Sequence, residues 1–194
     1  MTDHADLAAR WPLDTHLDVR DELLAAWGGP RRAYHDQRHL EEVLDRLDEL
    51  GCDDVVVLLA AWFHDGVHEG AADDEERSAA WAEHTLPRDV APEVGRLVRM
   101  TARHRPGADD LRGQLLSDAD LAILAAPAVR YAEYVADVRH EYAAVPDADF
   151  ARGRAAVLRD LLAKESLFHT GTARELWEER ARGNVTAELA ALDR

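Results

Sequence analysis

The sequence has little of several residue types, and each shortage excludes a class of protein. Cys52 is the only cysteine, so the chain can build neither a disulfide framework nor a cluster of thiolate metal ligands. Acidic residues outnumber basic ones by 39 to 23, which gives a formal charge of −16. Because binding to a phosphate backbone needs a basic surface, this balance argues against a nucleic-acid polymer as partner.

Long apolar runs are also lacking. The longest, residues 55–63 (VVVLLAAWF), is far shorter than the roughly 20 residues of a membrane-spanning helix. Residues 1–6 (MTDHAD) have neither the basic start nor the apolar centre of a signal peptide. We therefore predict a cytoplasmic protein with no membrane and no disulfide partner, and with a length that suits one domain and a substantial core.

What the chain does contain is helical periodicity, interrupted by glycine and proline. The predicted helices cover residues 14–27, 35–50, 55–63, 75–84, 93–104, 111–125, 128–144, 149–164 and 172–192. Residues 55–63 can equally form a buried strand, but no second strand is evident to pair with it. The predicted fold is all-α, a single domain over residues 1–194. Its core spans roughly 31–165, and the C-terminal helix 172–192, opened by a capping box of Thr172 and Glu175, packs on that core.

Histidines and aspartates gather in three short segments, residues 34–39 (YHDQRH), 63–65 (FHD) and 117–121 (SDADL). Imidazole and carboxylate are the donors that a hydrolytic divalent metal takes. His64 and Asp65 end an apolar run, where polar side chains need partners to offset their burial. Neighbouring helical side chains diverge by about 100°, so both can reach one ion only where the helix ends, and Gly66 supplies such an end.

Each of these residues also has a simpler interpretation. His35 and His39 share a helix face, which suits two solvent-facing histidines as well as a metal site. Asp118 is expected to be a helix N-cap, whereas Asp120 precedes an apolar stretch and is expected to point inward. His104 ends a predicted helix, where an imidazolium is favourable, but it can also be an extra ligand or a substrate contact.

The order His…His-Asp…Asp on helices resembles the HD-domain superfamily of metal-dependent phosphohydrolases. Residues 34–39 resemble the matching segment of cyclic-nucleotide phosphodiesterases, residues 63–65 the doublet that names the superfamily, and residues 119–121 its final acid. The resemblance is stronger to a subfamily of predicted metal-dependent HD phosphohydrolases and covers most of the chain. It includes residues 61–65 (AWFHD), 75–79 (EERSA), 101–104 (TARH), 118–121 (DADL), 139–142 (RHEY), 153–154 (GR) and 157–158 (VL).

Two positions depart from that subfamily, which usually has tyrosine at the position of His68 and asparagine at that of Asp74. Both lie in the loop after the His-Asp doublet, so they bear on substrate preference more than on metal binding. The resemblance implies a helical bundle with a metal site between helices. It implies one divalent cation (Mn, Mg, Fe, Co, Ni or Zn), with positions open to water and substrate, held by His39, His64, Asp65 and Asp120.

The resemblance also implies catalytic roles. Asp65 would orient the attacking hydroxide, and His35 would protonate the leaving oxygen, work that the near-neutral pKa of a histidine suits. The substrate implied is a small, nucleotide-like phosphate monoester or diester. Its phosphate oxygens would be bound by side chains that can form surface ion pairs instead. These candidates are Arg103, His104, Arg139 and Arg154.

Three alternatives stay open. HD folds with additional histidine ligands can hold two irons and act as oxygenases, and His68 and His104 are available for such a second site. A non-catalytic nucleotide-binding regulator is the second alternative, and a closed structural metal site is the third. The sequence leaves room for a homodimer.

Overall fold

A computed structural model gives the structure of residues 7–193, which contain α-helices and one 3₁₀ helix and no strand. The all-α prediction is confirmed. Residues 1–6, on which the expectation of no signal peptide rests, lie outside the described part. None of the described helices combines the length and the apolar character needed to cross a membrane. By its internal contacts the chain divides into two compact units, residues 1–120 and 121–194. The predicted organisation as a single domain stays a prediction.

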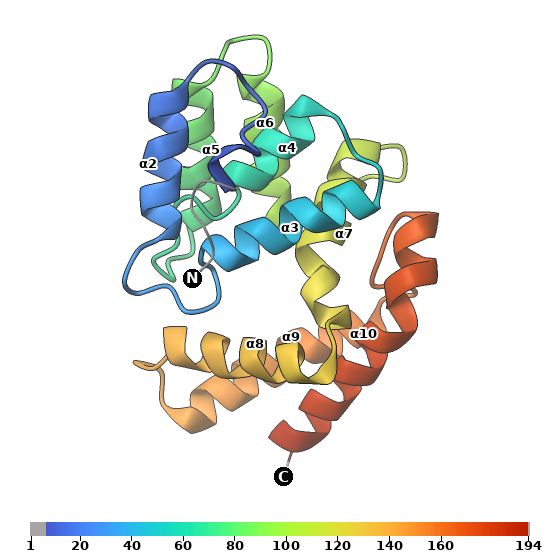
Figure 1. Cartoon of the computed structure of the whole chain (residues 1–194). Helices are drawn as coiled ribbons and strands as arrows, with labels where there is room; N and C mark the ends of the chain where they lie inside the picture. The colour runs from blue at the N-terminus through green and yellow to red at the C-terminus, as the bar shows by residue number, and fades with distance from the viewer. Residues whose placement is uncertain (1–6, 194) are drawn as a thin grey trace. The chain divides into compact units, whose positions relative to one another are not determined.

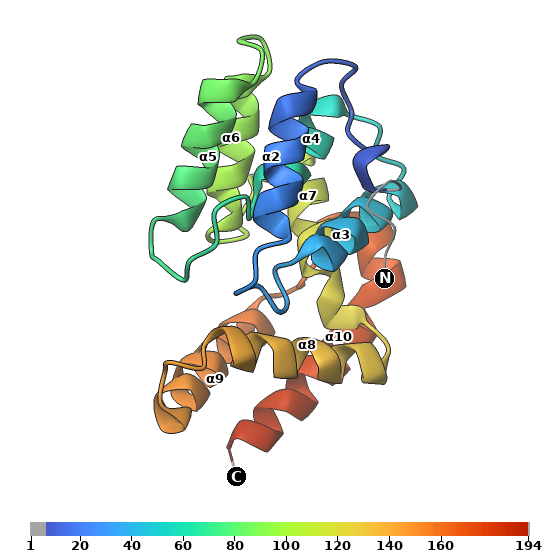
Figure 2. The same ribbon diagram turned by 60° about the vertical axis from the view of Figure 1, so that its left-hand side comes forward.

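The first unit is built around one apolar helix. Its helices are α2 (Leu17–Trp27), α3 (Gln37–Glu49), α4 (Val55–Phe63), α5 (Asp74–Thr85), α6 (Ala91–Thr101) and α7 (Leu111–Leu121). Helix α4 packs against α3, α5 and α6, and Figures 1 and 2 both show α5 and α6 side by side. Because α4 is apolar on nearly every side, burial is its only favourable environment. The choice of helix over strand for residues 55–63 is thereby confirmed.

Side-chain caps set where the two central helices begin. The Asp36 carboxylate accepts hydrogen bonds from the backbone N–H of Arg38 and of His39, so α3 starts one residue after Asp36. The Asp54 carboxylate accepts from the N–H of Val56 and starts α4 in the same way. These caps fix the first turn of α3 and with it the position of His39.

The second unit holds the 3₁₀ helix η1 (Ala122–Ala125), α8 (Ala128–Glu141), α9 (Asp147–Ala163) and α10 (Gly171–Leu192). Helix α10 packs on α9 and on η1. The capping box predicted at Thr172 and Glu175 is wrong, because the hydroxyl of Thr170 accepts from the N–H of Ala173 and starts the helix earlier.

A buried polar network joins the three long helices of this unit. The Arg154 guanidinium on α9 donates to Glu188 on α10, with 2.7 Å between Nε and Oε1, and to the Tyr134 hydroxyl on α8 at 2.8 Å. The Tyr131 hydroxyl, also on α8, donates to the same carboxylate. Burial, reinforced by the hydrogen bond to Glu188, raises the pKa of Tyr131 far above its usual range. The phenol is therefore a permanent donor in this network.

Candidate metal centre

Three side chains of the first unit bring their donor atoms together in its interior. His39 comes from the first turn of α3, His64 from the C-cap of α4, and Asp120 from the last turn of α7. One donor atom from each lies within 4.8 Å of the other two, so this group can hold a metal ion. Both histidines are buried, with 1% of their surface exposed.

The distances show how closely the donors converge. Nε2 of His39 lies 3.2 Å from Nε2 of His64 and 3.3 Å from Oδ1 of Asp120. Asp65 stands beside this group, with Oδ2 at 3.2 Å from Nε2 of His64 and 3.8 Å from Nε2 of His39. The structure thus brings together all four residues that the resemblance implied as ligands, three of them in the tightest group.

The end of α4 explains how His64 and Asp65 share one site. Phe63 is the last helical residue, and the N–H of Gly66 donates to the Phe63 carbonyl at 2.9 Å, which turns the chain sharply. A Cβ on Gly66 would stand 3.2 Å from that carbonyl and 3.2 Å from Leu23, so the turn is made with a residue that has none. This is the helix end that the sequence predicted.

A backbone contact orients the ring of His64. Its Nδ1 lies 2.8 Å from the carbonyl oxygen of Ala61, and because a carbonyl can only accept, Nδ1 must carry the proton. In the neutral ring, Nε2 then presents its lone pair to His39, Asp65 and Asp120. Such a hydrogen bond to the second nitrogen is the usual way of fixing a metal-binding histidine.

In the absence of a metal, a proton on His64 supplies the positive charge of the cluster. Burial opposes a charge on His64, but the carboxylates of Asp65 and Asp120 outweigh it and raise the pKa of His64 to about 9. Burial likewise favours neutral carboxyls, but the neighbouring histidines, His64 foremost, outweigh it and hold the pKa of Asp65 and of Asp120 well below the usual range. The site therefore attracts positive charge, as a cation site must.

Aromatic rings hold the two histidines in place. The Trp27 indole lies 5.3 Å from the ring of His64 and 6.1 Å from that of His39, and its N–H donates to the Trp62 carbonyl at 2.9 Å. Tyr34 is buried with its ring 4.7 Å from His39. No sequence signal identified Trp27, because it lies twelve residues before His39 and belongs to a different helix.

Asp118 and Asp120 have different surroundings. The prediction that Asp118 is an N-cap is wrong, because α7 begins at Leu111 and Asp118 lies inside it, 0% exposed. Asp120 faces His39, His64 and, with Oδ2 at 3.5 Å from Nε2, His104. The expectation that Asp120 points inward agrees with these contacts.

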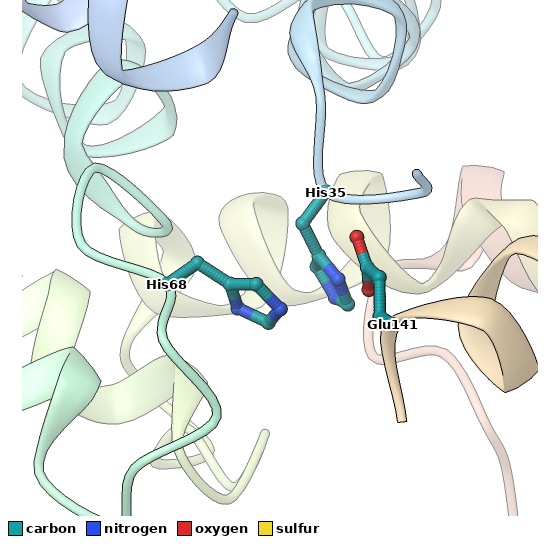
Figure 3. A group of neighbouring side chains, drawn as sticks. All are labelled: His35, His68 and Glu141. Atoms are coloured by element: carbon teal, nitrogen blue, oxygen red, sulfur yellow. The ribbon is translucent and has the colours of Figure 1, made fainter. Parts of the chain in front are cut away.

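His104 and His68 contact different parts of the site. His104 follows α6 with a left-handed backbone, φ 47°, and its Nδ1 lies 3.2 Å from the Ser117 hydroxyl on α7. His68 comes from the loop after α4 and stacks on His35, with 3.9 Å between ring centroids. Figure 3 shows the two imidazole rings next to each other. The His35 ring also lies 5.7 Å from that of His39, edge to face. The expectation that His35 shares a helix face with His39 is wrong, because His35 precedes the N-cap Asp36, but its ring still lies next to this candidate ligand.

The loop between α4 and α5 is closed by Asp74, one of the two departures from the subfamily. Its Oδ2 accepts from the N–H of Glu69 at 2.7 Å and from that of Ala71 at 3.0 Å. The amide oxygen of an asparagine can accept the same two bonds. This departure therefore leaves the means of closing the loop unchanged.

The three candidate arginines lie in different settings. Arg103 is exposed in the turn after α6. Arg139 donates to the carbonyls of Tyr142 and Val145 and to the carboxylate of Asp147. Arg154 is bound to Glu188 in the buried network of the second unit. The role of all three as phosphate contacts stays a prediction.

Comparison of the chain with models of protein families, with curated proteins and with solved structures finds no match. The resemblance to the HD-domain superfamily accordingly stays a prediction, based on the motifs of the sequence. The convergence of His39, His64, Asp65 and Asp120 is a feature of the structure and does not depend on that resemblance.

Proposed function

We propose that this protein is a metal-dependent hydrolase of phosphate monoesters or diesters, with its metal at His39, His64 and Asp120. The observation that carries the proposal is the approach of two imidazole Nε2 atoms to within 3.2 Å of each other beside a carboxylate oxygen 3.3 Å from one of them. Lone-pair donors packed so closely need a proton or a metal cation between them, and the two carboxylates beside them favour the positive charge. The mix of imidazole and carboxylate suits Mn²⁺, Fe²⁺, Co²⁺, Ni²⁺ or Zn²⁺, and Mg²⁺ less well.

A metal bound at this site would lower the pKa of a coordinated water and polarise the phosphoryl oxygen. Three or four protein donors leave an octahedral ion with free positions, whereas a purely structural site is closed. Asp65 stands beside the tight group, where its carboxylate can accept the proton of the attacking water. In the hydrolysis, the water oxygen bonds to phosphorus as the phosphorus–oxygen bond to the leaving group breaks.

His35 is the residue to protonate that leaving oxygen. Its ring is adjacent to His39 and stacked on His68, so it stands at the margin of the cluster and not among the ligands. A general acid in such a position contributes roughly 100- to 10,000-fold to the rate. The proton that Asp65 takes from the attacking water passes to His35 through solvent, so both side chains return to their starting protonation states after each turnover.

A screen of phosphate esters with metal-reconstituted protein tests the proposal. The chelated protein is loaded with Mn²⁺, Co²⁺, Ni²⁺, Fe²⁺, Mg²⁺ or Zn²⁺ and assayed on phosphomonoesters and phosphodiesters, nucleotides included. We expect turnover with at least one metal and none after chelation. The matched variants are His64→Ala, which removes a donor, and His84→Ala, which removes an exposed histidine of the same unit. Turnover that survives in His64→Ala, or its absence with every metal and ester, would refute the proposal.

A further inference from the structure

The side chain of Arg32 joins two loops that flank the candidate metal centre. One terminal nitrogen, Nη1, donates to the carbonyl of His35 at 2.7 Å, and the other, Nη2, donates to the carbonyl of Gly66 at 2.9 Å. The first carbonyl belongs to the loop between α2 and α3, and the second to the turn after α4. Arg32 and Gly66 are 34 residues apart in sequence.

Each of these carbonyls is next to a group that the proposed chemistry uses. The His35 carbonyl belongs to the proposed general acid itself and precedes Asp36, which caps α3 and holds the N–H of His39. The Gly66 carbonyl directly follows Asp65. A bridge between the two carbonyls therefore sets the position of His35 relative to Asp65.

The guanidinium of Arg32 also lies over an aromatic ring whose position is fixed. Its central carbon lies 5.1 Å from the centroid of the Trp27 ring, and Trp27 contacts both ligand histidines and is anchored by its N–H on α4. A planar cation on an aromatic face, with two donors pointing in fixed directions, is an arrangement that arginine can make and lysine cannot.

We propose that Arg32 is a positioning residue, which holds the imidazole of His35 at the metal centre by tying the His35 loop to the turn after Asp65. This inference rests on the proposed function. Arg32 acts through His35, so its loss should affect the protonation of the leaving group more than the binding of the metal.

The dependence of the hydrolysis rate on the leaving group gives the sharpest test. A phenolate needs protonation more than a 4-nitrophenolate, so loss of a general acid slows the phenyl ester more than the 4-nitrophenyl ester. Arg32→Gln should slow the phenyl ester by about 100-fold, the scale of a misplacement of about 1 Å, and the 4-nitrophenyl ester less. Metal content should be unchanged. His35→Ala should show the same leaving-group dependence, and the double variant should be no slower than His35→Ala alone.

Two further variants separate charge and folding from position. Arg31→Gln is the matched control, since it removes a neighbouring positive charge from a side chain that is 84% exposed, and it should leave both rates unchanged. Arg32→Lys retains the charge without the two-pronged geometry, so it should behave like Arg32→Gln. Full rescue by lysine, or an equal loss on both esters, would overturn the proposal.

A measurement without turnover distinguishes failure of this inference from failure of the proposed function. In the metal-free protein, the imidazole resonances of His35, assigned with His35→Ala, should shift in Arg32→Gln and stay in place in Arg31→Gln. Unmoved resonances in Arg32→Gln would overturn the positioning role. If the resonances shift while the wild type hydrolyses no ester, the function is refuted and the positioning of His35 by Arg32 stands.

Discussion

His104 faces Asp120, with 3.5 Å between Nε2 and Oδ2, and it does so from a backbone with φ 47°. A left-handed conformation costs a residue with a Cβ about 1–2 kcal/mol, and it persists only where the surroundings hold it. The Ser117 hydroxyl, one turn before Asp120 on α7, holds the other nitrogen of the ring. Asp120 thus directs Oδ1 to His39 and Oδ2 to His104, which orients the carboxylate of a candidate ligand.

Replacing His104 should weaken metal binding without unfolding the protein. Asparagine tolerates a left-handed backbone better than most residues, so His104→Asn removes the imidazole and keeps the turn. We expect Mn²⁺ affinity to fall by about 10- to 100-fold, as for other groups that orient metal ligands. Titration calorimetry measures it, with His84→Asn as the control. Unchanged affinity would mean that His104 does not orient Asp120.

His35→Ala should separate catalysis from metal binding. Because the His35 ring lies beside His39 and not in the tight donor group, metal content should stay near that of the wild type. Turnover should fall by roughly 100- to 10,000-fold, the usual contribution of a general acid. Elemental analysis and ester hydrolysis on one preparation provide the answer. Loss of both the metal and the activity in His35→Ala would show that His35 is a metal ligand.

The metal-free protein should lose stability at both ends of the pH scale. The pKa of His64 rises from its ordinary value of 6.5 to about 9 on folding, so its stabilising effect is complete below about pH 6.5 and is lost as the pH rises through about 9. The lowered pKa values of Asp65 and Asp120 contribute stability above about pH 4 that is lost in acid. Thermal unfolding of chelated protein should therefore peak between about pH 4 and pH 6.5.

Metal affinity should follow the opposite trend over the neutral range. A metal must displace the proton of His64, so affinity should rise by up to about tenfold per pH unit from about pH 6 to about pH 8.5. Calorimetry in buffers of different ionisation enthalpy should detect the released proton. An affinity independent of pH would show that His64 is not a ligand.

The buried pair of Arg154 and Glu188 should contribute to the free energy of unfolding and not to metal binding. Their side chains are 12% and 5% exposed, so Arg154→Met leaves a buried carboxylate without its cation and should cost about 3–5 kcal/mol of unfolding free energy. The double variant Arg154→Met with Glu188→Leu should recover only part of that loss, because it removes the unpaired charge but leaves the buried Tyr131 hydroxyl without its acceptor. Chemical denaturation measures both. A single variant as stable as the wild type would contradict this assignment.

Much of the site was predictable because its signals are local. The uniformly apolar α4 identifies a buried helix, Gly66 marks its end, and together they place His64 and Asp65 at a helix terminus. Asp120 precedes an apolar stretch, which indicates an inward-facing carboxylate. The error at Asp118 has a local cause as well, since a serine and aspartate pair resembles an N-cap even in the interior of a helix.

The contacts that support the site were not predictable from the sequence. Arg32 reaches Gly66, 34 residues away, and Trp27 reaches His64 from another helix. Such contacts depend on how helices pack, and one arginine among many has no pattern that distinguishes it. The left-handed backbone of His104 could not be predicted either, because glycine is the residue expected in that conformation and this position holds a histidine.

Binding of Mn²⁺ to two aspartate variants tests the central claim most directly. In titration calorimetry, chelated wild type and Asp109→Asn, which alters an exposed aspartate, should each bind one ion per chain at the same affinity. Asp120→Asn should bind none under the same conditions, because it removes the charged oxygen that lies 3.3 Å from His39. Undiminished binding by Asp120→Asn, or no binding by the wild type, would contradict a metal centre at His39, His64 and Asp120.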